Sequence, residues 1–117
     1  VRRAKIVRLV DADTVDVDID LGLSITTRQR LRLYGINAPE VRGPEKQAGL
    51  AATDHLAKLL VTFKIDGDWD IVVKTYKDKK GKFGRYLAEL IGVDAQGGPV
   101  NLNERMVADG HAVVAMY

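Results

Sequence analysis

The sequence predicts an α+β fold that is mainly β, with five strands, a helix between the third and fourth strands, and a second short helix near the C-terminus. Three observations predict it. Apolar and polar residues alternate with period two in several short stretches, one segment repeats apolar residues at helical spacing, and Gly or Pro marks the breaks. With 117 residues, 46% of them hydrophobic, we expect one domain over residues 1–117.

The first half of the chain predicts three strands. Residues 5–10 form an apolar stretch, and residues 14–20 alternate, with apolar side chains on one face and Asp16, Asp18 and Asp20 on the other. After a turn at 21–23, residues 28–34 alternate again and place three arginines on one face. We therefore expect a hairpin with outer faces of opposite charge, and cross-strand Asp–Arg pairs worth at most ~1 kcal/mol each.

The second half predicts two helices and two more strands. Pro44 starts a helix that continues to about Val61, because apolar residues recur there at helical spacing. Strands are expected over 69–76 and 85–93, around a basic turn at 77–82. Asn101 caps a short helix that ends near Gly110. This order of elements is that of an oligonucleotide-binding barrel.

Composition excludes some classes of protein and names no partner. The chain has 18 Lys and Arg against 16 Asp and Glu, a net charge of +2, and no cysteine. Disulfides and thiolate zinc sites are therefore excluded, but the compartment stays open. The apolar runs are too short to span a bilayer and no signal peptide is apparent, so we expect no membrane partner. We also expect a monomer. Six Lys and Arg, against one acid, fall within residues 74–85.

The stretch DADTVDVDID, residues 11–20, holds five aspartates. Three of them match the first ligand positions of an EF-hand, but Leu21 stands where that loop requires Gly and Thr27 where it requires an acid. The solvent face of a strand explains the last three aspartates better. Asp11 and Asp13 lie before the alternation begins, so this interpretation does not cover them.

Two further segments carry residues suited to phosphodiester chemistry. RLYGINAPE, residues 32–40, places Arg32 and Glu40 at the end of a strand, and GKFGR, residues 81–85, places Arg85 beside a basic turn. Guanidinium groups bind phosphate oxygens and stabilise the extra negative charge of the transition state, while a carboxylate can accept a proton from attacking water. A hard divalent cation at Asp13 would neutralise the same charge.

With the segments at residues 100–104 and 109–112, these motifs resemble the staphylococcal nuclease (thermonuclease) family in order and spacing over essentially the whole chain. The resemblance implies calcium-dependent hydrolysis of DNA or RNA that leaves 3′-phosphate ends. It implies that Glu40 is the general base and that Arg32 and Arg85 bind the scissile phosphate. It also implies that Lys82 contacts the neighbouring phosphate.

The resemblance further implies a calcium site, and the sequence departs from the family pattern at three places. Asp13 matches a metal ligand, and Ala38 matches a position that offers its backbone carbonyl. Asn37 stands where the family has a second ligating Asp, so we expect weaker binding of calcium. Phe83 replaces a Tyr, which loses a phenol contact and keeps a stacking surface. The family tyrosine that stacks on the base aligns with Met116, so Tyr117 could take that role only with a shift of one residue.

These observations leave three hypotheses open. The first is a metal-dependent nuclease acting on DNA, RNA or both. The second is a nucleic-acid- or protein-binding module on the same barrel with weak or lost catalysis, which Asn37 favours. The third treats the basic 74–85 segment as a solvated turn. His55 and His111 are interpreted as isolated helix and surface residues.

Overall fold

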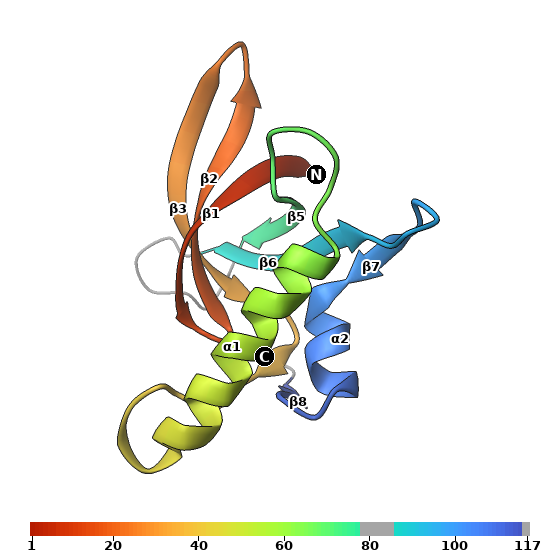
Figure 1. Cartoon of the computed structure of the whole chain (residues 1–117). Helices are drawn as coiled ribbons and strands as arrows, with labels where there is room; N and C mark the ends of the chain where they lie inside the picture. Colours follow the sequence, from red (N-terminus) through yellow and green to blue (C-terminus); the bar gives the residue numbers. More distant parts are fainter. Residues whose placement is uncertain (78–85, 116–117) are drawn as a thin grey trace.

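The structure is a computed structural model that describes residues 1–77 and 86–115, and Figure 1 shows the course of the chain. The elements carry the labels used in that figure. In chain order they are β1 (Arg2–Asp11), β2 (Thr14–Gly22), β3 (Ile25–Leu33), β4 (Ile36–Asn37), η1 (Gly43–Glu45), α1 (Lys46–Thr62), β5 (Ile71–Lys77), β6 (Tyr86–Val93), β7 (Pro99–Asn101), α2 (Leu102–Ala108) and β8 (Val113–Val114).

Five long strands form a closed barrel. They pair in the order β3–β2–β1–β5–β6, each antiparallel to its neighbour. The ring closes because β3 also pairs with β6 in parallel, through residues 31–33 and 86–88. α1 lies in the chain between β3 and β5, and Figure 1 shows it running across the barrel. The predicted mainly β fold, an oligonucleotide-binding barrel with an inserted helix, is confirmed.

The alternation of side chains places the core inside the barrel. Val15 and Val17 of β2 and Leu31 and Leu33 of β3 are fully buried, together with Ile71 and other apolar residues of β5 and β6. Because successive strand residues point to opposite faces, the charged residues between them lie outside. The register pairs Asp16 with Arg30 and Asp18 with Arg28, and both pairs are salt bridges of 2.8 Å. The predicted charged hairpin is confirmed.

The helices cover one end of the barrel. The 3₁₀ turn η1 carries the proline and leads into α1, whose buried residues are Gly49, Ala52, Leu56, Leu59 and Leu60. α2 begins at a cap in which the Asn101 side chain accepts the N–H of Glu104 at 3.2 Å, as the sequence predicts. Leu102 and Met106 of α2 are fully buried. Among the described residues, no helix has the length and apolar character needed to cross a membrane.

Three short strands, β4, β7 and β8, were not predicted. Each has two or three residues, which is too few for alternation to show. β4 pairs with β8, which lies far away in the sequence. β5 begins at Ile71, two residues after the predicted start. Asp70 turns the chain there, since its N–H donates to Ala4 O at 3.0 Å and its carboxylate accepts the N–H of Ile6 at 2.8 Å.

The interpretation of the two histidines as isolated is wrong. The rings of His55 and His111 stack with their centroids 4.4 Å apart, and His55 Nε2 lies 2.7 Å from Asp109 Oδ2. Arg105 Nε lies 3.5 Å from the same oxygen. Because His55 belongs to α1 and the other three residues lie in or just after α2, this cluster joins the two helices. This contact was not predicted because His55 lies far from the other three residues in the sequence.

Candidate active site

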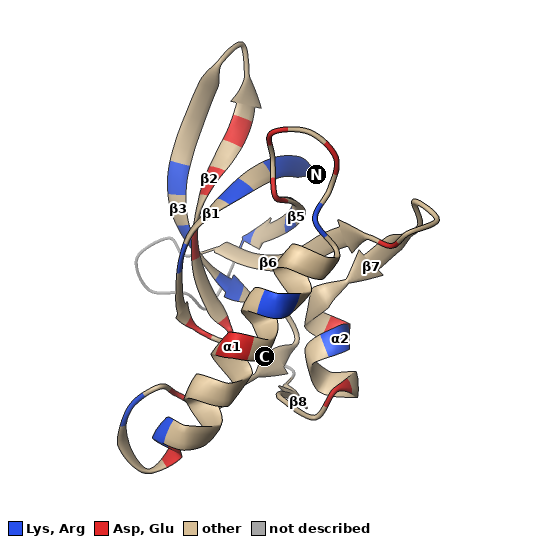
Figure 2. Cartoon of the chain, in the orientation of Figure 1, with Lys and Arg blue, Asp and Glu red and all other residues tan. Residues whose placement is uncertain are grey.

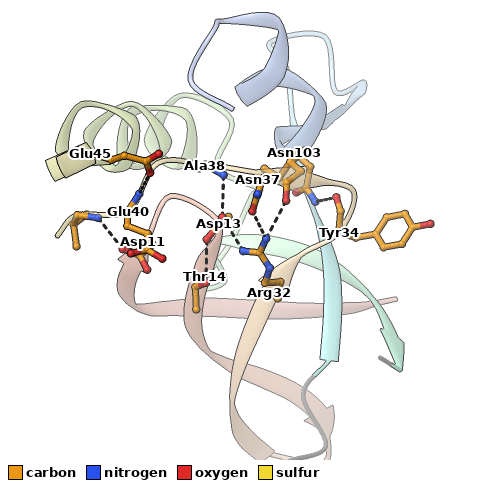
Figure 3. Close-up of polar contacts among 12 residues, drawn as sticks. Asp11, Asp13, Thr14, Arg32, Tyr34, Asn37, Ala38, Glu40, Glu45 and Asn103 are labelled. Carbon is orange, nitrogen blue, oxygen red and sulfur yellow. Dashed lines mark hydrogen bonds and ion pairs between the residues drawn. The ribbon is translucent and has the colours of Figure 1, made fainter. Parts of the chain in front are cut away.

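Asp13 occupies a nearly buried corner between β1 and β2. Only 5% of its surface is exposed, and its carboxylate accepts the Ala38 N–H at 2.9 Å and the Thr14 hydroxyl at 3.1 Å. Its backbone oxygen accepts the N–H of Leu33 at 2.8 Å, which fixes the corner against the end of β3. A buried carboxylate needs such donors, because an unpaired buried charge is costly. Figure 3 shows it at the centre of the polar cluster.

Arg32 connects this carboxylate to the next loop. Its Nη1 forms an ion pair of 2.7 Å with Asp13 Oδ2, and its Nη2 donates to Asn37 Oδ1 at 2.6 Å. Nη2 also donates to the backbone oxygen of Ile36 at 3.4 Å. One planar guanidinium thus binds the side chains from the β1–β2 corner and from β4 together (Figure 3). The Arg32 side chain is only 20% exposed.

Glu40 lies in the loop that leads from β4 to α1, and its side chain is exposed. Two carboxylates hold this loop. The Glu40 N–H donates to Glu45 Oε2 at 3.3 Å, and the next N–H, that of Val41, donates to Asp11 Oδ1 at 3.2 Å. Figure 3 places Glu40 on the Asp11 side of the cluster. The loop therefore presents one solvent-facing carboxylate beside the buried ion pair.

Gly49 allows α1 to approach this loop, although it was not among the predicted site residues. A Cβ at position 49 would lie 2.7 Å from the backbone nitrogen of Val41 and would clash with the backbone carbonyl of Glu40. Only a glycine in the helix lets the loop backbone come this close. A glycine in the first turns of an otherwise regular helix was the available signal, because glycine is disfavoured there without a packing reason.

Asn103 supports the site from α2 and was also missed. It is 2% exposed, and its amide donates to the backbone oxygens of Tyr34 at 3.0 Å and Ala88 at 2.9 Å. Its Oδ1 accepts the N–H of Leu90 at 3.1 Å. The side chain thus ties the chain just after Arg32 to β6. Its place next to the helix cap in the sequence gave no indication of this role.

The structure brings four of the predicted site residues into direct contact. They are Asp13, Arg32, Asn37 and Ala38, and Ala38 meets Asp13 through its N–H. Glu40 lies two residues further along the same loop. The other predicted residues, Arg85, Lys82, Phe83 and Tyr117, lie outside the described residues.

The oxygen atoms of this cluster are of the kinds that calcium binds, but they carry little negative charge. Carboxylate and amide oxygens, here from Asp13 and Asn37, are ligands that calcium takes. However, within residues 1–77 and 86–115 no group of three or more His, Cys, Asp or Glu side chains could hold a metal ion. Arg32 is bound to oxygens of both Asp13 and Asn37. A cation at these oxygens would therefore compete with the guanidinium, which implies weak affinity.

A pocket of about 530 Å³ opens beside this cluster. Asn37, Ala38 and Pro39 form one wall, and α1 and the turn after α2 form the others, with Ala48, Ala51 and His111 among the lining residues. Its walls are mostly small apolar side chains. The pocket places an open, partly apolar space next to the loop that carries Glu40.

The sequence was compared with models of known protein families and with curated proteins. The sequence model described as "Staphylococcal nuclease homologue" matches residues 30–117, three quarters of the chain. No curated protein matches the chain. The matched region contains Arg32, Asn37 and Glu40 and starts after Asp13, but the ion pair of Asp13 with Arg32 joins the unmatched strands to the matched site. The chain therefore belongs to the staphylococcal nuclease family and is a nuclease-like or nucleic-acid-binding domain.

Proposed function

We propose that this protein is a metal-dependent nuclease that hydrolyses DNA, RNA or both and leaves 3′-phosphate ends. The observation that carries the proposal is the joining of Asp13, Arg32 and Asn37 in one cluster, with the exposed carboxylate of Glu40 on the adjoining loop. A nearly buried Asp–Arg pair of this kind adds little net stability, so stability alone does not account for it.

Each residue has a distinct role in the proposed reaction. Glu40 accepts a proton from a water molecule whose oxygen forms the new bond to phosphorus. The bond from phosphorus to the 5′ oxygen breaks, and that oxygen takes up a proton, which leaves a 5′ hydroxyl and a 3′ phosphate. Arg32 stabilises the charge that develops on the phosphoryl oxygens, with Arg85 as the second guanidinium. A proton acceptor needs access to water, and Glu40 is exposed.

Calcium is the proposed metal, held by the side-chain oxygens of Asp13 and Asn37 and by the backbone carbonyl of Ala38. Bound there, it would neutralise part of the negative charge on the phosphodiester. Arg32 already binds both side chains, so a substrate phosphate would draw this guanidinium away from oxygens that the cation needs. Lys82, Phe83 and Tyr117 are the proposed contacts to the rest of the nucleotide.

Exchanging Glu40 tests the assignment of the general base. Glu40→Gln should lower turnover of single-stranded DNA by about 10²–10⁴-fold, the usual contribution of general-base catalysis, and leave oligonucleotide binding unchanged. Glu104→Gln is the control, since it removes the same charge from an exposed position on α2 and should retain most of the turnover. Equal turnover in the Glu40→Gln variant and the unaltered protein would remove Glu40 from this role.

A second function, a binding module with weak catalysis, is favoured by one observation. Asn37 is neutral, and Arg32 rather than a second acid faces Asp13. If the unaltered protein binds single-stranded DNA but does not cleave it in millimolar calcium, and Asn37→Asp restores cleavage, the binding module is the correct assignment.

A further inference from the structure

The tip of the β2–β3 hairpin is apolar and projects from the barrel. Among the described residues, β1 pairs with β2 only as far as Ile19, so the hairpin continues beyond it as two strands. Figure 1 shows this hairpin extending past the other strands. Residues 21–27, LGLSITT, contain no charged side chain. We call residues 21–25 the hairpin tip; its aliphatic side chains are Leu21, Leu23 and Ile25, which are 43%, 96% and 57% exposed.

Leucine is an unusual residue at the apex of this turn. Gly22 pairs with Ile25 across the turn. The two residues between them, Leu23 and Ser24, have φ angles of +54° and +64°. Positive φ at both central positions favours Asn or Gly, because a Cβ there lies too close to the following carbonyl. Leu23 therefore carries backbone strain and gains nothing from packing, since it is almost fully exposed. Strain without a packing reason points to a function for this side chain.

Asp20 holds the hairpin tip against the neighbouring strand. Its Oδ1 accepts the N–H of Gly22 at 2.8 Å, and its Oδ2 accepts Nη2 of Arg3 at 2.9 Å. The bond from Gly22 is the main reason why the pKa of this carboxyl is lowered, so the carboxylate stays charged at neutral pH. One side chain thus fixes the base of the tip to β1, and the apolar side chains stand on a defined support.

Positive charge surrounds the base of the tip. Arg2 and Leu21 line the same pocket of about 220 Å³, which Thr75 of β5 also lines, so these strand ends meet beside the tip. The charged residues on these strand ends are Arg2 and Arg3 on β1, Asp18 and Asp20 on β2, Arg28 on β3 and Lys77 on β5. Each of the two acids is paired with one arginine of this set, which leaves the charge of Arg2 and Lys77 in excess. Figure 2 shows the uncharged tip beyond charged segments of the same strands.

The shape of the tip decides which partner it fits. A stable protein interface buries about 800 Å² on each partner, and a convex apex with three aliphatic side chains offers far less. A lipid bilayer sets no such minimum area, because single side chains can enter the boundary of the acyl chains while nearby cations bind anionic headgroups. The hairpin has both parts in this order, with apolar side chains at the apex and positive charge at the base.

We propose that the hairpin tip docks the protein on an anionic lipid surface, with Leu23 inserted deepest and Arg2 and Lys77 at the headgroup phosphates. The expectation of no membrane partner followed from the lack of a spanning segment, which a contact from one side does not need. The inference is independent of the proposed function. Ile25 and Arg32 lie seven residues apart on β3, about 23 Å along the strand, so the docked tip holds the candidate active site away from the lipid.

Co-sedimentation with vesicles of phosphatidylserine and phosphatidylcholine tests the proposal. The unaltered protein should bind these vesicles at low salt and bind phosphatidylcholine alone at least about tenfold more weakly, since each cation near an anionic surface contributes a factor of about five. Leu23→Asn should weaken the binding about tenfold or more, because burial of a leucine side chain contributes a factor of roughly ten to a hundred. The same variant should be at least as stable in urea, because Asn tolerates positive φ. Lost binding without lost stability separates docking from folding.

Two further variants separate the apolar contact from the charges. Val61→Asn is the matched control, since it removes an aliphatic side chain that is 80% exposed near the end of α1, and it should bind as the unaltered protein does. Arg2→Gln/Lys77→Gln should weaken binding to the anionic vesicles about twentyfold, the product of the two cation factors, and leave stability in urea nearly unchanged.

Four results would overturn the proposal. The first three are absence of binding to anionic vesicles, equal binding by Leu23→Asn and the unaltered protein, and equal binding to vesicles with and without phosphatidylserine. The fourth is self-association of the unaltered protein in analytical ultracentrifugation that is lost in Leu23→Asn, because the tip would then contact a second copy of the chain. These measurements need no catalysis, so failure of the proposed nuclease would leave them unchanged.

Discussion

Replacing Gly49 by alanine tests whether α1 positions the loop that carries Glu40. The added methyl group would lie 2.7 Å from the Val41 nitrogen, where ordinary contact begins at 3.4 Å, and it would clash with the Glu40 carbonyl. The Val41 backbone must therefore move by about 0.7 Å, the difference between these distances, to regain ordinary contact, and the Glu40 carbonyl must move further. The helix and the loop cannot both keep their positions.

The energetic consequences partly cancel. Overpacking costs about 1–3 kcal/mol, whereas alanine in a helix interior is more stable than glycine by roughly 0.5–1 kcal/mol. We expect a net loss of about 1 kcal/mol, which corresponds to a fall in melting temperature of a few degrees. The effect on turnover should be larger, because a displacement of about 1 Å at a catalytic group can cost about a hundredfold in rate.

The assay compares kcat on single-stranded DNA with thermal melting followed by circular dichroism. Gly49→Ala should lose up to about a hundredfold in kcat while it stays folded, and oligonucleotide binding in chelator should remain near normal. Leu50→Ala, at the exposed neighbouring position of α1, is the control and should change kcat little. Full turnover in a folded Gly49→Ala variant would refute the claim that the helix sets the position of Glu40.

Three further changes are expected to have defined effects. Asn37→Asp should tighten calcium binding about tenfold or more in calorimetry, because ligand charge tunes calcium affinity; unchanged affinity would remove residue 37 from the metal site. Asn103→Ala should lower the free energy of unfolding in urea by about 2–4 kcal/mol, since it leaves buried backbone groups without partners; a loss under about 0.5 kcal/mol would contradict this. The Arg30 hydrogen bond lowers the pKa of Asp16 below its usual 3.8. The stability from that pair is therefore present above pH ~4 and lost as the pH falls through the lowered pKa, so Arg30→Gln should destabilise at neutral pH and match the unaltered protein in strong acid; a deficit that persists in strong acid would show another cause.

The sequence was sufficient to predict the barrel because its signals are periodic. The alternation of residues 14–20 and 28–34 fixes which side chains enter the core, and the structure confirms it. The spacing of apolar residues predicts a helix from Pro44 to about Val61, and the structure has it at 46–62, with Pro44 in the 3₁₀ turn before it. The strands β4, β7 and β8 were missed because their pairing depends on partners distant in the chain, which no local pattern records.

The residues of the candidate site could be predicted in part from the sequence, but their contacts could not. Asp13, Arg32 and Glu40 could be named because their residue types suit phosphodiester chemistry at the ends of strands, and Asn37 because the family resemblance places a metal ligand there. Their mutual contacts could not be predicted, and neither could the fact that Arg32 binds the two side chains proposed to hold the metal. Gly49 and Asn103 act through backbone atoms of other segments, so their roles became apparent only in three dimensions.

Cleavage of single-stranded DNA in calcium, compared with the same reaction in chelator, is the decisive measurement for the proposed metal-dependent nuclease. We expect degradation at millimolar calcium, products that end in 3′ phosphates, and no degradation once the metal is chelated. Degradation that continues in chelator would contradict the proposed metal dependence. Binding of the DNA without any cleavage at millimolar calcium would contradict the proposed nuclease.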